Sequence, residues 1–193
     1  MSAADDNWSV LMSPANNNNN NTNQIETKLN ALGLKLPESL KVPPNVKTPF
    51  SWIRIRGNMA YISGHGPQNP DGSVAGPFGK VGGEGEGEEE CQGGQVSLEQ
   101  AYQAAKLAGL SILGSLKREL GNLDLVTAWL QVRGMVNTVA GFTRTTDVIN
   151  GFSDLILTLY GSEVGMHTRS AIGVQALPLG LPVIIEGLVE VSV

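Results

Sequence analysis

The longest periodic stretch of the chain is SLEQAYQAAKLAGLSILGSLKRELG, residues 97–121. Ser97 and Gln100 match a capping box at the start of a helix, and Gly121 is a suitable stop. One stripe of this helix is apolar: Leu98, Ala101, Ala105, Ala108, Ile112, Leu113, Leu116 and Leu120. Because many of these residues are small, the pattern predicts a long helix packed closely on a sheet.

The segments on either side of this helix predict the remaining layers. Alternation and turn signals predict a hairpin, and a further strand is expected with Leu130, Val132 and Gly134 on one side. The predicted elements are a helix at 25–32, strands at 52–56 and 59–64, a strand at 126–136, a helix at 148–160 and strands at 170–176 and 182–193. Apart from the first short helix, the order is β-β-α-β-α-β-β. This order favours an α+β fold, a single mixed sheet with two helices on one face.

Two polar segments fall outside this core pattern. Residues 1–23 contain an unbroken asparagine run and are expected to be a disordered arm. Residues 82–94 form a Gly/Glu-rich insertion that holds Cys91. We therefore expect a single domain over 24–193. One cysteine and no readable signal peptide favour a cytoplasmic protein.

Composition excludes several functional classes. The chain has 193 residues with a net charge of −5, which argues against a nucleic-acid partner. No apolar run is long enough to span a membrane. One cysteine and two histidines leave little for a metal site, and no nucleotide-binding motif occurs, so no cofactor is expected.

Three residues stand out as candidate site residues. Arg169 begins a strand of small and apolar residues and could hold a carboxylate, or form a structural salt bridge. His65 follows the end of a buried strand, where it could line a site or be a satisfied structural residue. Glu186 interrupts an apolar strand and lies on the face opposite Ile185. It could be an edge or interface residue, or it could be a catalytic acid.

Several motifs together resemble the Rid family, also called the YjgF or endoribonuclease L-PSP family. The segment RSAIGVQALP (169–178) is similar to the family's ARSxVxVxxLP, and GNMAYISG (57–64) is similar to its GNxxxxSGQ hairpin. Val148, Ile149 and Asn150 match the opening of the second helix. The segments GKVG (79–82) and VSLE (96–99) resemble a longer subgroup that has an N-terminal helix.

The resemblance implies a chorismate-mutase-like fold and a homotrimer with ligand sites between subunits. Family enzymes hydrolyse reactive enamines and imines to 2-oxo acids and ammonia, without a metal or organic cofactor. Arg169 would bind the substrate carboxylate as the catalytic anchor. The substrate-binding positions carried over from the family are Phe50, Gly64, His65, Asn150, Ala171 and Glu186.

This sequence departs from the family pattern at several of these positions. Phe50 replaces a tyrosine, His65 a glutamine and Ala171 a cysteine. A family glutamate linked to water activation aligns with Ile184, and Glu186 aligns with a second glutamate two residues later. Loss of a general acid or base typically costs about 10²–10⁴-fold in rate.

Three functions follow from the sequence in order of preference. The first is an imine or enamine deaminase with a small carboxylate substrate bound by Arg169. The alternative is a non-catalytic module that binds or senses a small carboxylate, which Ile184 favours. Ribonuclease activity is the least favoured, because the chain is acidic and has no basic aromatic patch.

Overall fold

The computed structural model describes residues 23–42, 45, 47–82 and 95–192. The asparagine-rich arm, most of the Gly/Glu insertion and Cys91 lie outside the described residues. The elements are α1 (Gln24–Ala31), β1 (Ile53–Arg56), β2 (Met59–His65), α2 (Leu98–Leu120), β3 (Val126–Asn137), α3 (Thr145–Gly165), β4 (Thr168–Val174) and β5 (Val183–Val191). Two short 3₁₀ turns, Leu123–Leu125 and Pro178–Gly180, lie between them.

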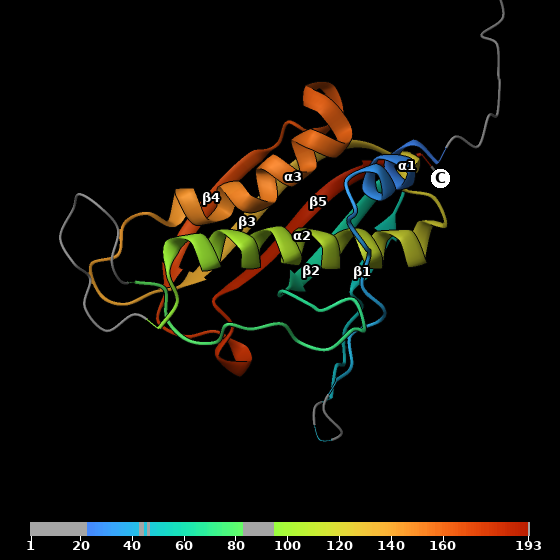
Figure 1. Cartoon of the computed structure of the whole chain (residues 1–193). Helices are drawn as coiled ribbons and strands as arrows, with labels where there is room; N and C mark the ends of the chain where they lie inside the picture. Colours follow the sequence, from blue (N-terminus) through green and yellow to red (C-terminus); the bar gives the residue numbers. More distant parts are fainter. Residues whose placement is uncertain (1–22, 43–44, 46, 83–94, 193) are drawn as a thin grey trace, which may run out of the picture.

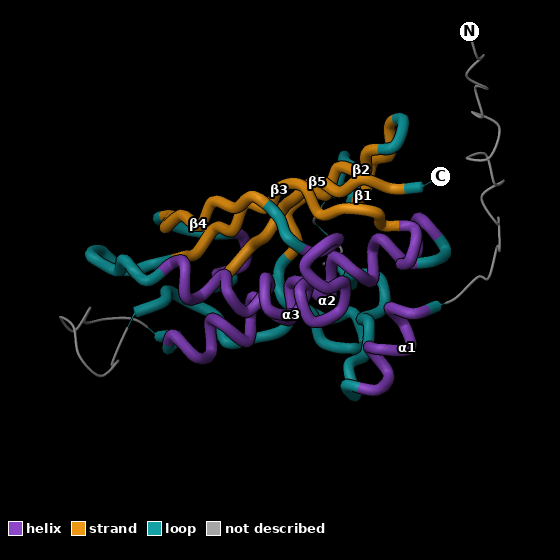
Figure 2. Tube along the Cα trace, turned by 90° about the horizontal axis from the view of Figure 1, so that it is seen from above, coloured by secondary structure: helices purple, strands orange, loops and turns teal. Residues whose placement is uncertain are grey.

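The five strands form one mixed sheet in the order β1-β2-β5-β3-β4. All neighbours are antiparallel except β3 and β4, which run parallel with α3 as their crossover. Figures 1 and 2 show α1, α2 and α3 on the same side of the sheet, which confirms the predicted layers. The strands β1 and β4 are therefore at opposite edges, a separation that governs where the site residues lie.

The helix α2 forms as its sequence predicts. The Ser97 side chain accepts from the Gln100 backbone, the Gln100 side chain accepts from the Ser97 backbone, and Gly121 ends the helix with φ of 77°. The predicted stripe is buried from Ala101 through Leu116, against α3 on one side and against the sheet. Close helix packing needs a glycine on α3, since a Cβ on Gly151 would be 2.1 Å from the Tyr102 carbonyl oxygen.

The structure corrects several sequence predictions. Register shifts around Trp129 form a β-bulge, so Trp129, Val132 and Gly134 are buried while Leu130 is only half-buried. Leu130 therefore does not share the face predicted for it. The second long helix begins at Thr145, not Val148, and one more turn follows Gly161, whose φ of 73° interrupts the helical geometry. The last two strands, β4 and β5, span 168–174 and 183–191 rather than 170–176 and 182–193.

The short helix α1 is fixed by contacts from distant parts of the chain. The Asp124 carboxylate accepts from the backbone nitrogens of Gln24 and Ile25, at 2.8 and 3.0 Å. Glu26 forms an ion pair with Lys117 of α2. Ile25 and Leu29 are buried against the core. Tertiary contacts thus stabilise a helix too short to be stable alone.

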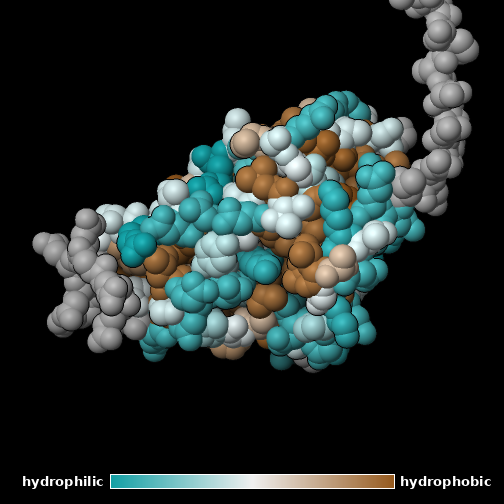
Figure 3. Space-filling model, turned by 45° about the horizontal axis from the view of Figure 1, so that its top comes forward, coloured by the Kyte–Doolittle hydropathy of each residue, from teal (hydrophilic) through white to brown (hydrophobic). Residues whose placement is uncertain are grey.

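Among the described residues, no helix could span a membrane, because none is both long and apolar enough. On the face seen in Figure 3, apolar side chains form separate small patches among hydrophilic ones.

Candidate functional site

Arg169 lies on β4 and faces α3. Its Nη1 atom donates hydrogen bonds to Asn150 Oδ1 at 3.0 Å and to Ser153 Oγ at 2.8 Å. The guanidinium forms no ion pair with a carboxylate among the described residues. Two neutral oxygens thus orient a cation whose charge they do not neutralise. Arg169 was expected either to hold a carboxylate or to form a structural salt bridge. Because it has no carboxylate partner among the described residues, the structure does not support the salt bridge.

His167 completes a three-residue hydrogen-bond network with this arginine. Its Nε2 lies 3.0 Å from Ser153 Oγ, and its Nδ1 lies 2.8 Å from the Gly165 carbonyl oxygen. Because a carbonyl only accepts, Nδ1 carries the proton, Nε2 accepts from the serine hydroxyl, and the serine oxygen accepts from Arg169. Burial lowers the pKa of His167, and the charge of Arg169 lowers it further against the opposing effect of Gly165.

Ala171 and Asn150 lie near Arg169, as the family resemblance implies. Ala171 is two residues farther along β4, on the same face, and its carbonyl oxygen accepts from Thr145 Oγ1 at 3.0 Å. Asn150 is on the first turns of α3 and contacts Arg169 directly. These three residues form the Arg169 group, at the β4 edge.

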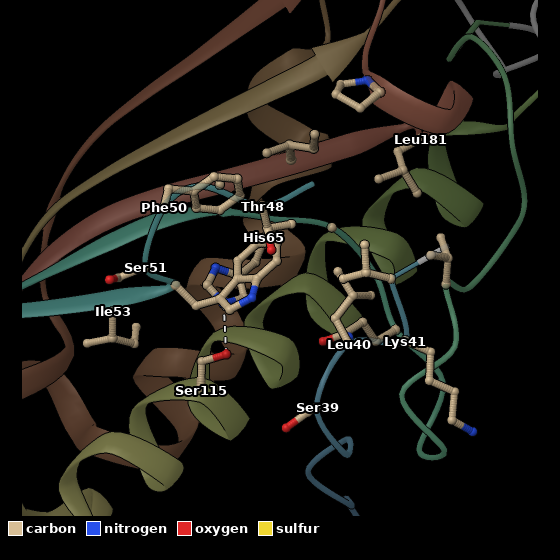
Figure 4. A pocket seen from close by; sticks show the side chains of 18 of the residues that line it. Ser39, Leu40, Lys41, Thr48, Phe50, Ser51, Ile53, His65, Ser115 and Leu181 are labelled. Atoms are coloured by element: carbon tan, nitrogen blue, oxygen red, sulfur yellow. Dashed lines mark hydrogen bonds between the residues drawn. The ribbon is translucent and has the colours of Figure 1, made fainter. Parts of the chain in front are cut away.

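Phe50, Gly64 and His65 line a cavity of about 670 Å³ at the other end of the sheet. Its walls are formed by the connection before β1, both open ends of the β1–β2 hairpin, the segment after β2, the second half of α2 and the β4–β5 connection, as Figure 4 shows in part. The ring centroids of Phe50 and Trp52 are 5.0 Å apart in an edge-to-face contact, and those of Trp52 and His65 are 5.1 Å apart with the ring planes tilted by 59°. Ile184, at the position of the family glutamate, also lines this cavity.

Both ring nitrogens of His65 are engaged inside the fold. Nδ1 lies 2.6 Å from the Ser63 carbonyl oxygen, and Nε2 lies 2.9 Å from Ser115 Oγ, the contact drawn in Figure 4. The side chain is only 4% exposed. Burial lowers the pKa of His65 from 6.5 to about 4; the Ser63 hydrogen bond opposes this and the charge of Arg118 adds to it. The geometry therefore favours the structural interpretation of His65.

Arg118 is a cavity residue that the sequence interpretation missed. Its Nη2 donates to Ser115 Oγ at 3.1 Å and its Nη1 to the Pro37 carbonyl oxygen at 3.0 Å. Like Arg169, it forms no ion pair with a described carboxylate. Burial lowers its pKa. In the sequence, Arg118 is in the last turn of a predicted helix, where basic residues are common. Only the folded structure shows that it lies near His65.

Glu186 belongs to neither group. Regular pairing between Arg133 and Glu186 places both on the sheet face opposite the helices, where Arg133 Nη1 and Glu186 Oε1 are 3.0 Å apart. Phe50 and Glu186 do border one shallow depression there. No register shift occurs between Ile184 and Glu186, so Glu186 does not take the place of Ile184 in the cavity. The described residues also hold no cluster of three His, Cys, Asp or Glu side chains suited to a metal.

The fold is the α+β, chorismate-mutase-like fold of Rid proteins. No family model matches the chain. It is 32% identical over 173 residues to Protein TCP17 of Trypanosoma cruzi, which covers 88% of this chain and 95% of that protein. Among solved structures it is similar to Atu1372 of Agrobacterium tumefaciens, a protein of unknown function, at 30% identity and a TM-score of 0.71, covering 90% of this chain and 95% of that one.

A second solved structure has the same fold. It is a protein of Shewanella oneidensis MR-1 whose name proposes an endoribonuclease, at 24% identity and a TM-score of 0.70, covering 87% of this chain and 99% of that one. The chain belongs to the Rid family, also called the YjgF or endoribonuclease L-PSP family. The family resemblance seen in the motifs is thereby confirmed.

Proposed function

We propose that the protein hydrolyses imines or enamines of small amino acids, with Arg169 binding the substrate carboxylate. One observation carries the proposal. The guanidinium of Arg169 is oriented by Asn150 and Ser153 and has no acidic partner among the described residues. A carboxylate would provide the missing negative charge, and an arginine binds it through two parallel hydrogen bonds.

The proposed site is completed by a second copy of the chain. The Arg169 group lies at the β4 edge, whereas Phe50 and Gly64 lie near the β1–β2 edge. One chain therefore does not bring these residues together around one small substrate. A homotrimer with sites between subunits, the arrangement that the family resemblance implies, would place the Arg169 group of one protomer beside the cavity of its partner.

The reaction needs modest assistance. Water adds to the C=N carbon of a 2-imino acid, and the resulting carbinolamine releases ammonia to leave a 2-oxo acid. Arg169 would neutralise the carboxylate and make the adjacent carbon more electrophilic. The Ala171 carbonyl keeps one lone pair for water after its bond from Thr145. Holding water and imine together reduces the entropic part of the barrier.

A second candidate is a non-catalytic module that binds a small carboxylate. It is favoured by Ile184, an apolar side chain in the cavity where the family has a glutamate. Glu186 is held in its ion pair with Arg133 and does not supply the missing carboxylate. In both candidate functions Arg169 binds the carboxylate. They differ in whether the bound molecule is hydrolysed.

The test generates 2-aminoacrylate or a related imine with a second enzyme and follows loss of its absorbance. We expect the wild-type protein to accelerate hydrolysis and Arg169→Ala to lower kcat/KM about 100-fold, since it removes a charged hydrogen-bond pair. Arg56→Ala, at an exposed position on β1, is the matched control and should change nothing. Unchanged hydrolysis by Arg169→Ala would contradict the assignment.

A gain-of-function variant separates the two candidates. Ile184→Glu restores the family residue, and we expect it to raise kcat at least about tenfold if water activation limits the rate. A folded wild-type protein that binds pyruvate in calorimetry but hydrolyses no imine would support the binding module. Light scattering during chromatography tests the trimer directly.

A further inference from the structure

Three contacts hold the ring of His167, which lies between the end of α3 and the start of β4. Its Nδ1 donates to the Gly165 carbonyl oxygen at 2.8 Å, and its Nε2 lies 3.0 Å from Ser153 Oγ. The ring also meets Phe152, a fully buried residue of α3, edge to face with 5.8 Å between the ring centroids. These contacts fix the orientation of the ring and direct its Nε2 at Ser153.

The charge state of His167 determines what Ser153 offers to Arg169. Burial and the charge of Arg169 lower the pKa of His167 against the opposing effect of the Gly165 hydrogen bond, so the ring is neutral at pH 7. Neutral Nε2 accepts the Ser153 hydroxyl proton, and the serine oxygen accepts from Arg169 Nη1. Ser153 is buried, so without this acceptor its hydroxyl would turn to another partner, such as the carbonyl oxygen one helical turn earlier. His167 thereby fixes the direction of the serine lone pairs.

The hydrogen bonds of Arg169 leave one edge of its guanidinium open. Nη1 carries two hydrogens, and Asn150 Oδ1 and Ser153 Oγ take one each, at 3.0 and 2.8 Å. Asn150 and Ser153 are three residues apart on α3, so they lie on one face of the helix. Nε and Nη2 donate to no described residue. These two nitrogens form one side of the planar fork, whose spacing matches the two oxygens of a carboxylate.

We infer that His167 is a positioning residue of the Arg169 site. Through Ser153 it holds the guanidinium so that the edge formed by Nε and Nη2, and not the end formed by Nη1 and Nη2, meets the substrate carboxylate. The inference rests on the proposed function, because both the deaminase and the binding module need Arg169 to bind a carboxylate. In this arrangement His167 acts on the substrate only through Ser153 and Arg169.

The orientation of Arg169 is measurable without any substrate. NMR of protein with isotope-labelled arginine gives separate Nη signals when hydrogen bonds slow rotation about the Nε–Cζ bond, and averaged signals when rotation is fast. We expect separate signals for Arg169 in the wild type and in His167→Gln, whose amide oxygen replaces Nε2 as the acceptor. Rotation should be at least about fivefold faster in His167→Leu, which lacks an acceptor. Equal rotation in wild type and His167→Leu would overturn the inference, whether or not the protein hydrolyses imines.

Pyruvate binding in calorimetry and imine hydrolysis measure the consequence for the site. His167→Leu should raise the Kd of pyruvate and the KM of the imine about tenfold and leave kcat within about twofold, because binding of the carboxylate is weakened equally in ground and transition state. His167→Gln should rescue both to within about threefold of wild type. Thr168→Val is the matched control, since neighbouring strand residues face opposite sides and Thr168 donates to the Leu130 carbonyl instead. A loss of kcat with unchanged KM in His167→Leu would overturn the positioning role.

Ser153→Ala tests whether His167 acts through the serine. It should also raise the Kd of pyruvate about tenfold, and adding His167→Leu to it should change the Kd by less than about twofold, because the link is already broken. Additive losses would overturn the inference. If His167→Leu does not fold, Ser153→Ala carries the test alone, and unchanged rotation of Arg169 in that variant would overturn the inference.

Failure of the proposed function gives a different result. A wild-type protein that neither binds pyruvate nor hydrolyses an imine, while rotation of Arg169 responds to His167→Leu and His167→Gln as expected, would contradict the proposed function. The same result would support the orientation of Arg169 by His167.

Discussion

The two arginine networks are alike in connection and different in burial. In each, a helix serine lies between an arginine and a histidine whose other nitrogen donates to a backbone carbonyl. His65 is 4% exposed, whereas His167 is half-buried. Water can therefore replace a lost partner at His167 more readily than at His65. The same arrangement of arginine, serine and histidine is therefore expected to contribute more to stability around His65 than around His167.

The largest expected effect comes from changing the distance between α2 and α3, the helices that carry Ser115 and Ser153. Gly151→Ala would place a Cβ 2.1 Å from the Tyr102 backbone oxygen, so α2 and α3 must move apart. We expect a loss of about 3 kcal/mol or more in the free energy of unfolding, measured by urea denaturation. In Gly109→Ala the nearest atoms belong to the side chains of Leu155 and Phe152, which can shift, so about 1 kcal/mol is expected. Equal losses would contradict the backbone clash.

The next effect is the acid sensitivity of His65. Its pKa is lowered by burial from 6.5 to about 4. Between these values only the unfolded chain binds the proton, so stability falls as the pH decreases through this window and is fully present above pH 6.5. The complete loss amounts to about 3 kcal/mol. The urea midpoint of the wild-type protein should be lower at pH 4.5 than at pH 7. This difference should shrink more in His65→Gln than in His167→Gln.

Removing each serine compares the networks directly. Ser115→Ala leaves Nε2 of a buried histidine without a donor, and about 2 kcal/mol of stability should be lost. Ser153→Ala should cost about 1 kcal/mol, because His167 remains accessible to water. Chemical denaturation at pH 7 measures both. A larger loss in Ser153→Ala would reverse the ranking drawn from burial.

The smallest effect concerns the arginines themselves. Arg118→Gln and Arg169→Gln should each lower the free energy of unfolding by no more than about 1 kcal/mol, because each removes two hydrogen bonds that water can partly replace and neither breaks an ion pair with a described carboxylate. Each should raise the pKa of its histidine, because a nearby positive charge is removed. Histidine NMR titration of the two variants detects this. A pKa that does not move would mean that the arginine charge does not reach the ring.

Local patterns predicted most of the fold and only part of the candidate site. Ser97, Gln100 and Gly121 act within a few residues, so their roles were evident from the sequence. The bulge near Trp129 and the early start of α3 at Thr145 depend on packing between distant elements, which no local pattern records. Arg118 was missed for the same reason, because Ser115 and His65 meet only across the fold. Arg169 was a candidate from the sequence because it begins a strand of otherwise small and apolar residues, and its role stays a prediction.

The capping of α1 by Asp124 bears on the order in which the chain folds. The carboxylate that completes the start of this helix lies 100 residues after Gln24. During synthesis, α1 leaves the ribosome long before its partner exists, and eight residues do not sustain a helix by themselves. We therefore expect α1 to dock late, after α2 and the turn at Leu123–Leu125 are in place. Until then we expect Ile25 and Leu29, which are buried in the folded protein, to be exposed to solvent.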